Sequence, residues 1–378
     1  MNIPLFDYLL LNQIPGLGAA SCLDLMNKFG SIRGLLSAKP ESLPLDAGAK
    51  RLLDNYWAEG DKSDIAQKAQ SEITWCEENQ VEIIPLSSED YPALLKQIHR
   101  PPPLLYVRGD ITQLHRPQLA LVGSRKPSAG GLENAMAFGR YLAASGFTVT
   151  SGLALGIDGA AHQGALKAGG STIAVLGCGI DKIYPYRHTE LAEQIVASGG
   201  ALVSEFPIGT PPTPALFPQR NRVISGLSMG VLVVEAALRS GSLITAREGL
   251  QQGREVFAIP SSIHNPQSKG CHRLLKDGAT LVESAQDLVN ELQGLIELKA
   301  SELENSPQMP LLAVEADAIV SEKEQAVLGK MGYDPISVDA LLARTKMSVR
   351  ELGVILVSLE LKDCIKLTPY GYESLKMN

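Results

Sequence analysis

A chain of 378 residues is long enough for two or three domains, and its 45% of hydrophobic residues can bury a large core. The net charge of −7 argues against a protein that coats DNA indiscriminately, and the 5% of aromatic residues argue against extensive base-stacking surfaces. The five cysteines form no Cys-x-x-Cys pair, and the chain has neither a long apolar run nor a signal-peptide pattern. We therefore expect no structural zinc, no disulfide framework and no membrane anchor, and we expect a cytoplasmic protein.

The first segment, residues 1–72, is expected to form a separate helical module. Residues 14–20 read Ile-Pro-Gly-Leu-Gly-Ala-Ala, a turn between two short helices, and residues 29–36 follow at the distance expected of a second unit. This pattern resembles a helix-hairpin-helix module, whose glycine-rich hairpin can offer backbone N–H groups to a DNA phosphate. A hairpin that serves packing alone is the alternative.

Residues 73–297 alternate short apolar runs with glycine turns and helical segments. Strands are predicted at 81–85, 119–122, 148–150, 172–176, 201–204, 231–234 and 256–259. The prolines at 101–103 forbid a helix and predict an extended approach to a further strand. The alternation predicts a doubly wound, Rossmann-like, mostly parallel α/β sheet.

The stretch 217–246 carries the clearest signal for a ligand site. Arg-Asn-Arg at 220–222 precedes the strand at 231–234, and Arg239-Ser240-Gly241-Ser242 then leads into a helix from Leu243. Ligands bind at the carboxyl ends of strands in such sheets, where helix N-termini present N–H groups to anions. The sequence therefore predicts a phosphate site, either for free phosphate or for a nucleic-acid backbone.

The C-terminal part falls into an acidic linker, residues 298–321, and a small winged-helix domain, residues 322–378. A helix start is predicted at 336–341, a second helix with Ser348 as its N-cap, and a β-wing at 364–372. The candidate recognition helix carries only Lys346 and Arg350 as basic residues. This weak charge favours protein contact or modulation over DNA recognition.

Several long motifs occur together in one order. They are Val-Gly-Ser-Arg-Lys-Pro-Ser at 122–128, Ser-Gly-Leu-Ala-Leu-Gly-Ile-Asp at 151–158, Tyr184-Pro185, Phe-Pro-Gln-Arg-Asn-Arg at 217–222 and Ser-Gly-Ser-Leu-Ile-Thr-Ala at 240–246. Over about residues 85–289 the chain resembles the DNA-processing DprA (Smf) family. The resemblance implies a non-enzymatic recombination mediator that binds single-stranded DNA taken up in natural transformation. It also implies loading of the RecA recombinase, displacement or bypass of single-strand-binding protein, and a homodimer formed through the Rossmann-like domain.

The resemblance also implies the residues of a DNA pocket. Its members would be Gly123, Ser124, Arg125, Phe217, Arg220, Asn221, Arg222, Ser240, Gly241 and Ser242, with Phe217 beside a base. We expect backbone N–H groups at 123–124 and 240–242 to hold phosphates, with no cofactor and no metal. Phe217 precedes a proline and a charged tripeptide, which favours an exposed loop. Structural ion pairs of the arginines with Glu205 or Glu235 are the alternative.

Enzymatic readings match the motifs less well. Gly123-Ser124-Arg125 is not a G-x-G-x-x-G fingerprint, and no G-x-x-x-x-G-K-[ST] motif for ATP occurs. Asp158 and His162 lie four residues apart, which suits a helix cap and a polar contact better than an acid–base pair. The alternative function is a lysine-decarboxylase-like phosphoribohydrolase acting on nucleoside monophosphates with Glu235. Such enzymes carry Pro-Gly-Gly-x-Gly-Thr before the catalytic glutamate, a motif that is missing here.

Overall fold

The computed structural model describes residues 5–14, 45–292 and most of 322–345, together with scattered positions between 25 and 43 and between 347 and 374. The chain divides into two compact units, residues 1–309 and 310–378. The finer boundaries expected at residues 72, 297 and 321 stay predictions. The acidic linker lies outside the described residues.

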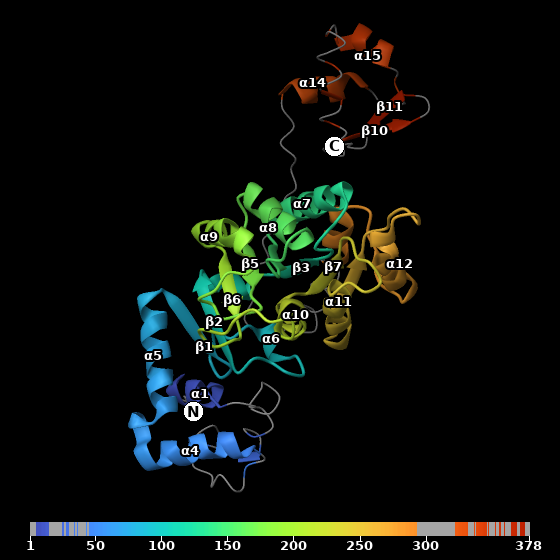
Figure 1. The fold of residues 1–378 in the computed structure, drawn as a ribbon. Coiled ribbons are helices and arrows are strands. Elements are labelled where there is room, and N and C mark those ends of the chain that lie inside the picture. Colours follow the sequence, from blue (N-terminus) through green and yellow to red (C-terminus); the bar gives the residue numbers. More distant parts are fainter. Residues whose placement is uncertain are drawn as a thin grey trace, which may run out of the picture. The chain divides into compact units, whose positions relative to one another are not determined.

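A nine-stranded sheet organises the first unit (Figure 1). Its order is β1 (Val81–Pro85), β2 (Leu104–Gly109), β6 (Ala201–Ser204), β5 (Thr172–Val175), β4 (Thr148–Ser151), β3 (Gln118–Val122), β7 (Gly230–Val233), β8 (Glu255–Ala258) and β9 (Thr280–Leu281). Seven neighbouring strands are parallel to one another: β6, β5, β4, β3, β7, β8 and β9. Strand β2 pairs antiparallel with both β1 and β6. The predicted mostly parallel, doubly wound sheet is confirmed. The extended approach after the prolines is itself strand β2, and the two-residue β9 was not predicted.

Helices cover both faces of the sheet. One set is α7 (Ala129–Ala144), α8 (Ile157–Lys167) and α9 (Thr189–Ala197), and the other is α10 (Leu216–Leu227), α11 (Ser242–Gln251) and α12 (Lys269–Lys276) (Figure 1). Side chains alternate along each strand, so Leu119 and Leu121 of β3 pack in the cluster with α7 and α8. Ala120 and Val122 belong to the cluster that includes α10 and α11. Both faces of the central strands are buried, and most of their residues are apolar; the buried polar residues of β4 are hydrogen-bonded, with Thr150 donating to Gln118 Oε1 at 2.7 Å and Ser151 to Leu121 O at 2.6 Å.

The chain reverses its direction of growth across the sheet after β6. It runs outward from β3 through β4 and β5 to β6, then returns along α10 to place β7 beside β3. The loops after β3 and β7 therefore leave neighbouring strands toward helices on opposite faces. Such a switch point opens a crevice at the carboxyl ends of the strands, which is where open α/β sheets bind ligands.

The N-terminal helices are α1 (Leu5–Asn12), α4 (Ala47–Glu59) and α5 (Asp64–Glu78), and they share one apolar cluster with the sheet. A buried carboxylate of α5 adds polar links to this packing. Glu72 of α5 accepts hydrogen bonds from Gln13 Nε2 at 2.7 Å and from the backbone N–H of Ile208 at 2.9 Å. Burial raises the pKa of Glu72, while hydrogen bonds from Ile208, Tyr106 and Gln13 lower it. Of the hairpin expected at 14–20, residues 15–20 lie outside the described residues.

The second unit has a small core of its own. Helices α14 (Glu322–Met331) and α15 (Val338–Thr345) pack with Leu352 and Ile365 in one apolar cluster. Strands β10 (Ile365–Thr368) and β11 (Gly371–Ser374) pair antiparallel, as the predicted wing requires. The expected helix capped by Ser348 falls on residues that are for the most part not described.

Candidate nucleic-acid interface

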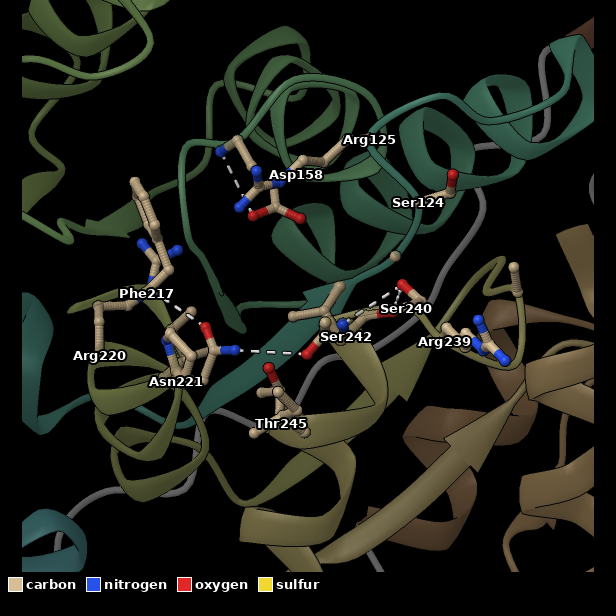
Figure 2. A pocket seen from close by; sticks show the side chains of 18 of the residues that line it. Ser124, Arg125, Asp158, Phe217, Arg220, Asn221, Arg239, Ser240, Ser242 and Thr245 are labelled. Carbon is tan, nitrogen blue, oxygen red and sulfur yellow. Dashed lines mark hydrogen bonds between the residues drawn. The ribbon is translucent and has the colours of Figure 1, made fainter. Parts of the chain in front are cut away.

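A pocket of about 700 Å³ opens at the carboxyl ends of β3 and β7 (Figure 2). Nine of the ten predicted site residues line it: Gly123, Ser124, Arg125, Phe217, Arg220, Asn221, Ser240, Gly241 and Ser242. The lining also includes residues outside the predicted set, among them Lys126, Asp158, Tyr184, Arg239, Thr245 and Gln267. The structure thus brings together segments that are more than 100 residues apart in sequence. Of the ten predicted site residues, Arg222 alone does not line the pocket.

Phe217, Arg220 and Arg222 lie on helix α10, and not on the exposed loop that we expected for Phe217. Pro218 falls in the first turn of this helix, where a missing N–H costs nothing. Residues two apart on a helix point in nearly opposite directions. Arg220 therefore lines the pocket, whereas Arg222 turns away from it.

Arg222 is one half of a buried ion pair. Its guanidinium bonds the carboxylate of Glu205, and only 12% and 8% of the two side chains stay exposed. Burial raises the pKa of Glu205, and the charge of Arg222 and its hydrogen bond lower it. Of the two readings open for Arg222, the geometry matches the structural ion pair.

Arg220 forms the floor of the pocket and ties two strand ends together. It is 4% exposed, and Nη1 donates to the carbonyl oxygens of Gly152, at 2.8 Å, and Val175. Burial lowers the pKa of its guanidinium to about 10, although the nearby Asp158 raises it. Arg220 is still a cation at neutral pH, so it gives the floor a fixed positive charge.

Asp158 and His162 have separate structural roles. Asp158 Oδ2 accepts from the backbone N–H groups of Gly152 and Ala154, in the loop before α8, so it is not the helix cap that we expected. Thr172 Oγ1 donates to Val149 O, so His162 Nδ1, 2.7 Å away, must donate to Thr172 Oγ1. Burial lowers the pKa of His162 to about 3, and the ring is neutral.

The carboxylate of Glu235 is hydrogen-bonded to the start of helix α7. It accepts from the backbone N–H of Ser128 at 2.9 Å and from the Ser128 hydroxyl, at the start of that helix. The carbonyl oxygen of Glu235 accepts from the Ser124 N–H at 2.7 Å. Glu235 is 4% exposed and does not line the pocket. A hydrolytic role for this glutamate is therefore excluded by its contacts.

The same contacts change the expected phosphate ligands. Because the Ser124 N–H is bound to Glu235, it cannot also hold a phosphate. The Ser124 hydroxyl accepts from the Lys126 N–H at 3.1 Å. The same loop, after β3, presents the exposed side chains of Arg125 and Lys126 to an anion.

The loop after β7 meets the expectation only in part, because the Ser240 N–H donates to Ala237 O at 2.9 Å and the Ser242 N–H to Ser240 Oγ at 3.4 Å. Helix α11 begins at Ser242, and the hydroxyls of Ser240 and Ser242 lie 2.7 Å apart at its N-terminus (Figure 2). Asn221 Nδ2 donates to Gly241 O at 3.4 Å and links α10 to this loop. Arg239 is exposed at the edge of the pocket, so hydroxyls, a helix N-terminus and a cation occur side by side.

An aromatic and cationic stack closes the opposite side of the pocket. The Arg125 guanidinium carbon lies over the Phe217 ring, 5.3 Å from its centroid. The Tyr184 and Phe217 ring centroids are 5.6 Å apart at an interplanar angle of 40°. Tyr184 occurs in one of the recognised sequence motifs, but its spacing gave no indication that it would meet Phe217.

In the part of the chain that the structure describes, no cluster of three potential metal ligands occurs, and no helix is long and apolar enough to cross a membrane.

The family comparisons agree with the motifs. A family model described as DNA recombination-mediator protein A matches residues 82–293, and one described as DprA winged helix domain matches residues 312–369. Protein Smf of Escherichia coli (strain K12) is 45% identical over 307 residues, 81% of this chain and 81% of that protein. The DNA processing protein DprA of Bacillus subtilis (strain 168) is 43% identical over 216 residues, 57% of this chain and 72% of that protein.

Solved structures give the same result. The DprA structure from Streptococcus pneumoniae aligns with a TM-score of 0.67 at 34% identity, covering 77% of this chain and 99% of that one. DprA from Helicobacter pylori, described for its single-stranded DNA binding mode, aligns with a TM-score of 0.51 at 31% identity, covering 57% of this chain and 96% of that one. The extent and identity of these matches show that the chain belongs to the DprA (Smf) family of DNA recombination mediators, which are not enzymes.

Proposed function

We propose that this protein binds single-stranded DNA in the pocket between β3, β7 and α10, and that it acts there as a recombination mediator. The observation that carries the proposal is the ring of cations around the pocket. Arg125, Lys126 and Arg239 are exposed at its edge, while Arg220 is fixed in its floor. On a chain of net charge −7, this local excess of positive charge suits a polyanion.

The chemistry of the pocket favours a single strand over a duplex. Phosphates can contact Arg239 and the start of α11 on one side, while Tyr184, packed beside Phe217, presents aromatic surface on the other. A single strand exposes both its phosphates and its unstacked bases, whereas a duplex hides the base faces. Cationic grooves with aromatic side chains are the usual means of binding single strands without sequence preference.

The further partners rest on the family resemblance. We propose that the bound strand is handed to the RecA recombinase, with displacement or bypass of single-strand-binding protein, and that the protein acts as a cytoplasmic homodimer. A dimer would place two pockets on one strand, and linked sites increase the apparent affinity. RecA filament formation on strands coated with single-strand-binding protein, with and without this protein, tests the handover.

Fluorescence anisotropy with labelled single-stranded and double-stranded oligonucleotides tests the binding itself. The affinity should fall with salt, and each phosphate contact should contribute a slope of about −0.7 in log K against log salt. An affinity independent of salt would contradict the phosphate contacts. A chain truncated after Glu297 should keep its single-strand affinity, and loss of that affinity would assign binding to the C-terminal unit instead.

A further inference from the structure

The ring of Phe217 is already surrounded by protein groups. Arg125 lies over the ring and Tyr184 lies 5.6 Å from it, centroid to centroid. Its Cδ1 atom lies so close to Gly177 that a Cβ there would come within 2.7 Å. Phe217 is also only partly exposed. A base that stacked directly on Phe217 would first have to displace one of these neighbours.

Tyr184 has the free surface that Phe217 lacks. It is 46% exposed, and it lines both the main pocket and a side niche of about 60 Å³. Leu155 and Pro185 give the niche apolar walls, and Leu155 is itself 38% exposed. An exposed flat ring beside apolar walls, at the edge of a cationic pocket, provides a surface for the face of a nucleobase.

The segment that carries Tyr184 is held firmly. Three residues after the adjoining Pro185, the turn closes with the His188 N–H donating to Pro185 O at 2.9 Å. The His188 ring nitrogen Nδ1 lies 2.7 Å from Leu153 O, which ties this segment to the loop before α8. Phe217 supports the Tyr184 ring from α10. Tyr184 is thus a positioned platform and not a side chain that binding must first order.

We propose that Tyr184 stacks on a nucleobase of the bound strand, with Phe217 and Arg125 as its support and the Leu155–Pro185 niche beside it. The proposal rests on single-strand binding in the main pocket and adds the residue that contacts a base. Phosphates bound near Arg239 and a base on Tyr184 would place the strand across the whole pocket, because the two residues line the same cavity. Phe217, which the sequence pointed to, becomes the supporting ring.

The test combines side-chain variants with oligonucleotides that lack bases. Affinities for a short dT strand and for a fully abasic strand of equal length and charge are measured for wild type, Tyr184→Leu and Tyr184→Phe. Tyr141→Leu is the matched control, because Tyr141 is a comparably exposed tyrosine (38%) on α7 that does not line the pocket. Thermal midpoints check that every variant is folded.

Tyr184→Leu should weaken binding of the dT strand by roughly five- to a hundredfold, the range of one base–aromatic stack. It should change abasic-strand binding by less than about twofold, while Tyr184→Phe and Tyr141→Leu stay near wild type on both strands. The proposal is overturned if Tyr184→Leu weakens the binding of both strands equally or of neither. It is also overturned if a fourth variant, Phe217→Leu, weakens dT binding selectively while Tyr184→Leu does not. Failure of the wild type to bind dT at all would instead overturn the proposed function.

Discussion

Removing the guanidinium of Arg222 is expected to destabilise the first unit, and not to remove a DNA contact. Arg222 and Glu205 are paired and almost fully buried, so Arg222→Met leaves a carboxylate buried without its partner. Breaking a buried pair in this way costs about 3–5 kcal/mol. For a unit of this size, that corresponds to a fall in the thermal midpoint on the order of 6–20 °C.

Two further variants make this prediction specific. Arg222→Met with Glu205→Met should recover most of the lost stability, because an apolar pair of similar volume replaces the ion pair. Arg108→Met is the control: its pair with Glu193 is 33% and 51% exposed, and such pairs contribute about 1 kcal/mol or less. A thermal midpoint unchanged in Arg222→Met, together with loss of single-strand binding, would refute the reasoning and place Arg222 on the DNA.

Three more predictions concern buried groups of the first unit. Gly152→Ala would bring a Cβ within 2.5 Å of Arg220 Nη2, so it should destabilise the protein by about 1–3 kcal/mol and weaken DNA binding. Gly130→Ala is the control, because a Cβ there meets no heavy atom within 4 Å, and it should not destabilise the protein. Equal urea unfolding midpoints for the two variants would contradict this prediction. His162 has a folded-state pKa of about 3, below its ordinary value of 6.5, because the ring is buried. Below pH 6.5 the unfolded chain therefore binds a proton that the folded chain does not. The free energy of unfolding should fall as the pH drops from about 6.5 toward 3, by about 2 kcal/mol at pH 5. Urea midpoints at pH 7 and pH 5 measure this loss, which His162→Gln should reduce; an identical loss in the variant would assign it to other groups. Glu72→Ala should cost about 1–3 kcal/mol by leaving buried donors unpaired, and Glu72→Gln less; equal losses in the two variants would contradict a role as hydrogen-bond acceptor.

The strands and the location of the site could be predicted because both depend on short-range patterns. Apolar runs such as 119–122 and 231–234 are followed by glycine and serine turns, and the observed strands agree to within a residue. Once the sheet is parallel, the carboxyl ends of its strands meet at one edge. That argument needs no side-chain contacts and gives the location of the site. The ten individual residues came from the family resemblance, and nine of them line one pocket.

The roles of individual side chains depend on contacts that no pattern encodes. Arg220 and Arg222 look equivalent in the sequence, yet the helix points one to the pocket floor and the other to Glu205. The N–H of Ser124 appeared available to a phosphate, but β7 runs beside β3 and supplies the Glu235 carbonyl as its partner. These outcomes follow from helix phase and strand order, which are fixed only when the whole sheet assembles.

The most direct test of single-strand binding in the pocket reverses one exposed charge at its edge. Anisotropy with a labelled dT oligonucleotide compares wild type with Arg239→Glu and with Arg140→Glu, an exposed arginine on α7 that does not line the pocket. Arg239→Glu should weaken binding by about tenfold or more at moderate salt and flatten the salt dependence, while Arg140→Glu stays near wild type. Equal affinities of Arg239→Glu and wild type, or equal losses in both variants, would contradict DNA binding in this pocket.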